Sequence, residues 1–206
     1  SRGREEKNTE KTILEAAEKL FLDKGFALTS TVEIAKEAGC NQAMVHYYFR
    51  TKEKLFNIIF ENKIQELMQA VYGSDDPSLP FTERLKRMVE AHYEVLARNP
   101  KFPFLFFSEL STNPARFRVM IQKMSKLPVT IMERFADDLK KEIEAGRIRN
   151  ITPLGLLQTI VSLNITPFLI NPLFKEITGM NDEEYQILIN QRKQENAIII
   201  MRSLMP

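Results

Sequence analysis

The stretch TVEIAKEAGCNQAMVHYYF, residues 31–49, decides the fold of this chain. Within it, Gly39 follows Ala35 by four residues and precedes Val45 by six. This spacing predicts two short helices that cross closely at a glycine turn. Ala35 is small enough for the crossing, and Gly39 can take a left-handed conformation that costs other residues about 1 kcal/mol or more. Spacing alone fits both a DNA-binding helix-turn-helix and an ordinary helical hairpin with glycine in its turn.

The residues on either side of this stretch favour the DNA-binding interpretation. From about Ile13 to Phe56 the chain resembles the TetR family of bacterial transcriptional regulators. The resemblance rests on several motifs taken together: Gly25-Phe26, Thr29-Ser30, Ile34-Ala35, Ala38-Gly39, Tyr48-Phe49, and Lys52-Glu53 followed by Leu55. Beyond Phe56 the chain matches the family only in its layout. The resemblance implies an all-α fold of about nine helices, with a DNA-binding domain at residues 1–56 and an effector-binding and dimerisation domain at residues 57–206.

The resemblance also implies DNA contacts at the start of each short helix. Thr29 and Ser30 would stand at the N-terminus of the first, where hydroxyls, backbone N–H groups and the helix dipole suit a phosphate. Gln42, Ala43 and Met44 would begin the recognition helix in the major groove. There Gln42 could pair with an adenine edge and Met44 could touch a thymine methyl group.

The remaining expected DNA contacts follow along the recognition helix and beyond it. His46 stands where the family usually has tyrosine, and its imidazole can still contact a phosphate. Tyr47 is expected to reach a base or a phosphate, and Lys52 to clamp the DNA backbone. Tyr48 belongs to the same set, although a packed wedge with its hydroxyl outward is the more ordinary role for such a side chain.

Helical patterns continue through the rest of the chain, and no run of strict two-residue alternation predicts a strand. The loop at residues 73–80 is the best soft boundary after the first four expected helices. Residues 114–145 are predicted to form one long helix with a kink at Pro128. Apolar residues dominate the last two expected helices, which start near Thr152 and Asn181.

Composition excludes several classes of protein. The net charge is only +2, and residues 1–56 hold 10 Lys and Arg against 9 Asp and Glu, so DNA binding must depend on a few placed charges. The single cysteine, Cys40, excludes an internal disulfide and suits a cytoplasmic protein. No apolar stretch is expected to reach the roughly 18–20 residues needed to span a membrane. Motifs of catalytic sites are missing, so we expect no catalytic residue, metal ligand or cofactor.

Residues 81–176 are the expected effector pocket. Large, adaptable apolar side chains are frequent there, and the candidates that would line a pocket are Phe107, Phe117, Met120 and Met124. Polar candidates that would orient a ligand are His92, Tyr93 and Asn164. The alternative is that these side chains simply fill the core.

The last two helices are too apolar on all sides for a free surface, so they form either the centre of the core or an interface. The resemblance favours a homodimer through these helices. Together these features predict a dimeric repressor that a small apolar or amphipathic effector releases from a palindromic operator on double-stranded DNA. The alternatives are a ligand-independent DNA-binding protein with a filled core and an all-helical lipid carrier or enzyme.

Overall fold

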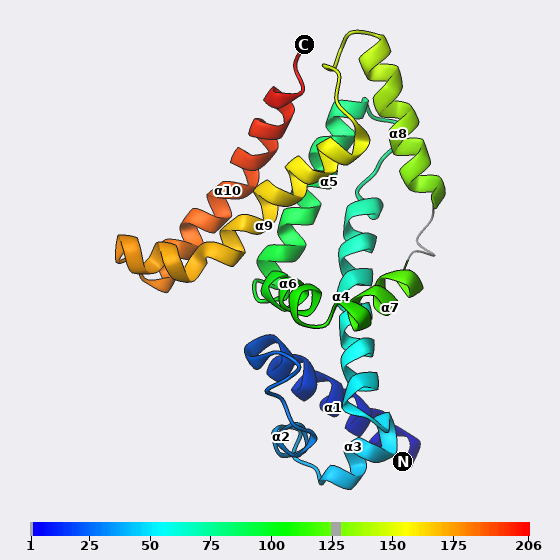
Figure 1. Cartoon of the computed structure of the whole chain (residues 1–206), viewed down its shortest axis with the longest axis vertical. Coiled ribbons are helices and arrows are strands. Elements are labelled where there is room, and N and C mark those ends of the chain that lie inside the picture. Colours follow the sequence, from blue (N-terminus) through cyan, green and yellow to red (C-terminus); the bar gives the residue numbers. More distant parts are fainter. Residues whose placement is uncertain (1, 125–128) are drawn as a thin grey trace. The chain divides into compact units, whose positions relative to one another are not determined.

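Ten α-helices and no strand make up the part of the chain that the structure, a computed structural model, describes. That part is the backbone of residues 2–124 and 129–206 and the side chains of residues 8–119, 122 and 132–206. The all-α prediction is confirmed (Figure 1). In order the helices are α1 Arg2–Lys24, α2 Thr31–Glu37, α3 Gln42–Phe49, α4 Lys52–Gly73, α5 Phe81–Arg98, α6 Phe102–Thr112, α7 Pro114–Met124, α8 Val129–Glu144, α9 Pro153–Thr178 and α10 Asp182–Ser203.

The prediction of one long helix over residues 114–145 was wrong. The structure has two helices there, α7 and α8, so the described residues form ten helices where about nine were expected. Proline has no N–H to donate and its ring clashes with the preceding turn, so Pro128 is a physical reason for a break rather than a kink. Pro128 itself lies outside the described residues.

Tertiary contacts divide the chain into two compact units. The first consists of residues 1–65 and 105–121, and the second of residues 66–104 and 122–206. The boundary expected after residue 56 differs from this division, which adds residues 57–65 and 105–121 to the first unit.

The first unit is built around α1, α2, α3 and the first half of α4. Its short helices begin at side-chain caps: Ser30 and Glu33 form a capping box for α2, and the Asn41 side chain accepts from the Met44 N–H in α3. Between them Gly39 has a φ of 68°, as its position in the turn requires. Fully or almost fully buried side chains form the core: Ile13, Ala17, Phe21, Ile34, Val45, Phe49, Leu55, Phe56, Ile59 and Phe60.

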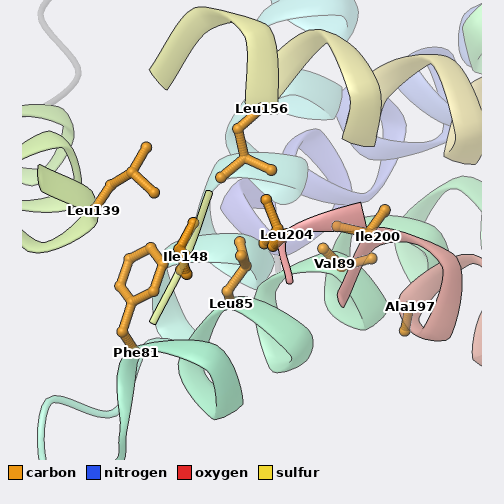
Figure 2. Close-up of a cluster of buried hydrophobic side chains, with 9 residues drawn as sticks. All are labelled: Phe81, Leu85, Val89, Leu139, Ile148, Leu156, Ala197, Ile200 and Leu204. Atoms are coloured by element: carbon orange, nitrogen blue, oxygen red, sulfur yellow. The ribbon is translucent and has the colours of Figure 1, made fainter. Parts of the chain in front are cut away.

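The second unit is organised around α5, which packs against α8, α9 and α10. One face of α5 supplies Phe81, Leu85 and Val89 to an apolar cluster (Figure 2). Figure 2 shows these side chains with others from α8, α9, α10, the segment before α9 and the residue after α10: Leu139, Ile148, Leu156, Ala197, Ile200 and Leu204. This burial fixes α5 in the middle of the unit.

The loop between α4 and α5 is fastened by charged groups. Arg84 Nε donates to Asp75 Oδ1 at 2.6 Å, and Arg84 Nη1 donates to Asp138 Oδ2 of α8 at 2.9 Å. Arg134 also donates to Asp75 Oδ2 at 2.7 Å. Hydrogen bonding from Arg84 lowers the pKa of Asp75 despite its burial. The loop and α8 are thus held to α5 by one guanidinium group.

α9 differs from what its sequence suggests. It runs without a break to Thr178 although Pro167 and Pro172 lie inside it. By length and composition it could cross a membrane, so the expectation that no stretch reaches such a length was wrong. Uncharged polar residues interrupt its apolar run, but no charged residue appears before Lys175. Only 17% of its most apolar 18-residue segment is buried within the chain. A large apolar face of α9 therefore remains uncovered.

Candidate nucleic-acid interface

The turn between α2 and α3 gives the first unit its helix-turn-helix. The Cys40 N–H donates to the Ala35 carbonyl at 2.9 Å, and the Gly39 N–H donates to the Lys36 carbonyl at 3.2 Å. Val45 and Phe49 are buried, so α3 rests on that face and presents its other side outward. The exposed side carries predicted DNA contacts: Gln42, Ala43, His46 and Tyr47.

Tyr47 and Tyr48 differ in burial. The Tyr47 side chain is 66% exposed, and its ring lies edge-on to Tyr48, with 5.1 Å between centroids. Tyr48 is half-buried and also contacts the Phe49 ring. Tyr47 is therefore the more accessible of the two rings, and Tyr48 packs beside it. Met44 is half-buried as well, so of the first three residues of α3 it is the least accessible.

Gln42 is oriented from the neighbouring helix. Its side-chain Nε2 donates to Thr31 Oγ1 at 2.9 Å, across the turn from α2. An amide group has two N–H donors and a carbonyl oxygen, so one donor and the acceptor remain for a base. An adenine edge needs one donor and one acceptor, which is what Gln42 retains.

His46 holds the C-terminal end of α3. Its Nδ1 lies 3.1 Å from the Arg50 carbonyl oxygen, and the Arg50 N–H donates to the His46 carbonyl at 3.0 Å. Arg50, with a φ of 64°, is the one non-glycine residue with positive φ among the described residues. Because a carbonyl oxygen only accepts, Nδ1 carries the hydrogen and Nε2 of the neutral ring is an acceptor. A neutral His46 can therefore accept from a base amino group, and it can donate to a phosphate only when the ring is protonated.

Thr29 is placed in the core rather than on the surface. Its side chain is 1% exposed, and its hydroxyl donates to the Gly25 carbonyl at 2.8 Å. The donor that a phosphate would need is already used, so the structure does not support a side-chain DNA contact for Thr29. Ser30 is exposed, but its hydroxyl and its backbone N–H both donate to Glu33 Oε2 at 3.0 Å, so its donors are used within the helix cap as well.

Lys52 acts inside the unit. Its Nζ donates to the carbonyl of Phe26 at 3.0 Å and to that of Thr29 at 2.9 Å, and it lies 4.2 Å from the centre of the Phe26 ring. An ammonium group has three donors, so one is left for a phosphate. The residue forms one wall of a shallow surface hollow of about 360 Å³ whose other walls are Ala27, Leu28, Thr29, Ser30 and Thr31.

Acidic residues of α2 are matched by lysines of α1. Lys24 pairs with Glu33 at 2.5 Å, and Lys19 pairs with Glu37. Hydrogen bonds from Lys24 and from Ser30 lower the pKa of Glu33 to about 2. Glu33 therefore stays ionised as part of the helix cap, and its charge is compensated within the protein.

Comparison with known proteins agrees with this geometry. Residues 13–59 match the family model described as bacterial regulatory proteins, tetR family. Its helix-turn-helix domain belongs to the TetR family. Among its relatives, an uncharacterized HTH-type transcriptional regulator of Bacillus subtilis (strain 168) is 29% identical over 143 residues, which cover 69% of this chain and 73% of the relative. A fatty acid metabolism regulator protein of the same organism is 19% identical over 182 residues, covering 86% and 92%.

A solved structure extends the likeness beyond the helix-turn-helix. The TetR family transcriptional regulator PfmR from Thermus thermophilus has a TM-score of 0.66 to this chain, at 22% identity, with 94% of this chain and 99% of that chain covered. The fold of the family thus spans both units. The chain is a DNA-binding transcriptional regulator, and the helix-turn-helix is its DNA-binding element.

The predicted effector-binding residues of this chain fall into two groups. Phe117 lies in the first unit, where its ring contacts Phe106 at 5.0 Å and Phe60 at 6.3 Å between centroids. Phe107 packs against Phe106 in the same unit, at 5.5 Å. The side chains of Met120 and Met124 lie outside the described residues.

The polar candidates belong to the second unit. Asn164 Nδ2 donates to the Val89 carbonyl and lies against His92 Nδ1, each at 3.0 Å. Tyr93 instead donates its hydroxyl to the Ile189 carbonyl at 2.7 Å. Asn196, which the sequence analysis did not single out, extends this hydrogen-bonded row of His92 and Asn164, because its Nδ2 donates to Asn164 Oδ1 at 3.0 Å. No local pattern marks Asn196, since its partners come from other helices.

Proposed function

We propose that the chain is a homodimeric repressor that binds a palindromic operator and is released from it by a small, largely apolar effector. One observation carries the DNA-binding part of this proposal: the exposed side of α3 presents an oriented Gln42 together with Tyr47 and His46. Since the operator is bacterial DNA, the regulator acts in the cytoplasm. The test is selection of bound duplexes from a random pool, which should yield a two-fold symmetric sequence.

Apolar residues on α9 and α10 support the dimer. The two helices pack against each other, and both leave large apolar side chains exposed: Leu154, Leu157, Leu173, Phe174, Ile177, Ile187, Leu188, Ile198 and Ile199. A second copy of the chain would cover this surface by two-fold symmetry. Two recognition helices spaced about 34–36 Å apart then read successive major grooves, which accounts for a palindromic site.

The His92 ring supports the effector site. The amides of Asn164 and Asn196 are oriented by carbonyl acceptors, so Asn164 Nδ2 donates to His92 Nδ1 and the ring hydrogen sits on Nε2. Among the described residues no partner accepts from this Nε2–H. Asn164 and Tyr93 have used their donors, so His92 is the one polar candidate with a donor to offer.

This donor narrows the chemistry of the effector. Burial lowers the pKa of His92 to about 4, so the ring is neutral at physiological pH. A neutral N–H donor suits a molecule with a carbonyl or other acceptor on an apolar body. The Bacillus subtilis relative named as a fatty acid metabolism regulator makes fatty acids and their thioesters the first molecules to test.

The experiments separate the two halves of the proposal. Gln42→Ala and Tyr47→Ala should each weaken operator binding, while Lys140→Ala on α8 serves as a control. Oleic acid or oleoyl thioester should release the operator from the wild-type protein, and His92→Phe should require more of it without a change in DNA affinity. If no acyl compound weakens operator binding, the effector class is wrong and the ligand-independent alternative gains support.

A further inference from the structure

Two cations lie against the ring of Phe26, which lies in the connection from α1 to α2. The guanidinium carbon of Arg116, on α7, is 3.7 Å from the ring centre, and Lys52 Nζ is 4.2 Å from it. Phe26 also contacts Phe56 and Phe21, with 5.1 Å and 6.0 Å between centroids. A half-buried ring with this many partners has few rotamers open to it.

Arg116 is itself fixed by an acidic partner. Its Nε donates to Glu109 Oε2 at 3.0 Å and its Nη2 donates to the same oxygen. The Glu109 side chain is 5% exposed and that of Arg116 is 14% exposed. The Arg116 N–H donates to Asn113 Oδ1, which caps the start of α7. A desolvated guanidinium held in this way is a rigid platform for an aromatic ring.

Phe26 in turn sets the path of the DNA-facing connection. Its carbonyl and that of Thr29 both accept from Lys52 Nζ, so the position of the Phe26 backbone determines where Lys52 lies. The same short connection ends at Ser30, the cap of α2, and it forms the wall of the surface hollow beside Lys52. A shift of the Phe26 ring would therefore displace Lys52 and Ser30 together.

We propose that Arg116, held by Glu109, is a positioning residue for DNA binding. By stacking on Phe26 it fixes the connection from α1 to α2 and so places Lys52 for contact with the phosphate backbone. Arg116 lies outside residues 1–56 and uses its Nε and Nη2 donors on Glu109, so its effect on DNA acts through Phe26. The inference rests on the proposed DNA-binding function and adds α6 and α7 to the machinery that performs it.

The test is operator affinity measured over a range of salt concentrations for wild type, Arg116→Ala and Arg116→Lys. Arg118→Ala is the matched control, since Arg118 is an exposed arginine on the same helix. Arg116→Ala should weaken operator binding about tenfold, the size expected when a desolvated cation no longer stacks on the ring. The slope of log K against log salt should flatten by about 0.9 for each phosphate that the variant no longer neutralises. Arg116→Lys should recover part of both effects, and Arg118→Ala should leave affinity and slope unchanged.

The salt slope separates positioning from mere stability. A variant that only folds less well would show a smaller active fraction in stoichiometric titration and an unchanged slope, and that result would overturn the proposal. If Arg116→Ala does not fold, Glu109→Gln replaces it, because this variant keeps an acceptor for Arg116 while removing the charge, and it should show a smaller loss of the same kind. Wild-type protein that binds no DNA would refute the proposed function itself. Wild-type binding with no change in Arg116→Ala would refute only the positioning role.

Discussion

Individual residues decide the geometry of the helix-turn-helix. Gly39 takes a φ of 68°, and a Cβ built there would meet no atom within 4 Å. Any cost of a side chain at this position is therefore conformational and not steric crowding from neighbours. His92 is the residue with the largest consequence in the second unit, because it is a neutral ring held in a row of buried amides.

Gly39→Ala should lower the free energy of unfolding by about 1 kcal/mol, since alanine must adopt the left-handed conformation. Urea denaturation followed by circular dichroism measures the change. Gly73→Ala is the matched control, because Gly73 ends α4 without a positive φ and also has open space around its Cβ. Equal stability of the two variants would show that the turn does not constrain residue 39.

Acid should destabilise the fold through His92. The pKa of this residue is about 4 in the folded protein and about 6.5 when unfolded. The unfolded chain therefore binds more protons between these values, and stability present above pH 6.5 is lost as the pH falls toward 4. Between pH 7 and pH 5 the loss should be about 2 kcal/mol.

Urea unfolding at several pH values tests the assignment to His92. His92→Phe should remove most of the pH dependence between pH 7 and pH 5, while His46→Gln, a change at the exposed histidine, should keep it. A pH dependence that survives in His92→Phe would have to come from other groups.

Among the helices, N-terminal caps determine where each helix begins, and buried ion pairs determine how the helices pack. Capping boxes start α2 and α10, and Thr152 followed by proline starts α9. The residues that form each cap lie within four positions of one another, so the sequence alone reveals them. The fastening of α8 and the α4–α5 loop to α5 through Arg84 joins residues 54 positions apart, and sequence alone does not reveal it.

Arg84→Met should destabilise the second unit by about 2–3 kcal/mol, because it removes the guanidinium group that pairs with both Asp75 and Asp138. The value is at the low end for a buried pair because Arg134 still pairs with Asp75 and Lys141 still pairs with Asp138. Arg87→Met on the same helix is the control, since its ion pairs are exposed and its loss should change stability by less than about 0.5 kcal/mol. Thermal unfolding of both variants would show whether the buried ion pairs of Arg84 stabilise the second unit.

At the scale of the whole molecule, the uncovered apolar faces of α9 and α10 are the main feature that one chain leaves unexplained. Ile198→Glu should convert a dimer into a monomer with unchanged helix content, because a buried unpaired charge at an interface is strongly unfavourable. Operator affinity should then fall by about 100-fold, as expected when two linked half-site contacts become separate.

Sedimentation and gel-shift titration test this prediction together. Val119→Glu, the same kind of change at an exposed apolar residue of α7, should leave the sedimentation coefficient unchanged. An Ile198→Glu protein that still sediments as a dimer would place the interface elsewhere.

The local features of this chain can be predicted from its amino-acid sequence. The Ala35–Gly39–Val45 spacing, the caps at Ser30 and Asn41 and the all-α class follow from interactions between residues close in the chain, whose patterns are visible in the letters. Tertiary structure decided the rest. It buried Thr29, turned Lys52 toward backbone carbonyls, divided α7 from α8 and brought Arg116 onto Phe26, 90 positions away. These outcomes depend on which distant side chains share a buried space, and no local pattern records that.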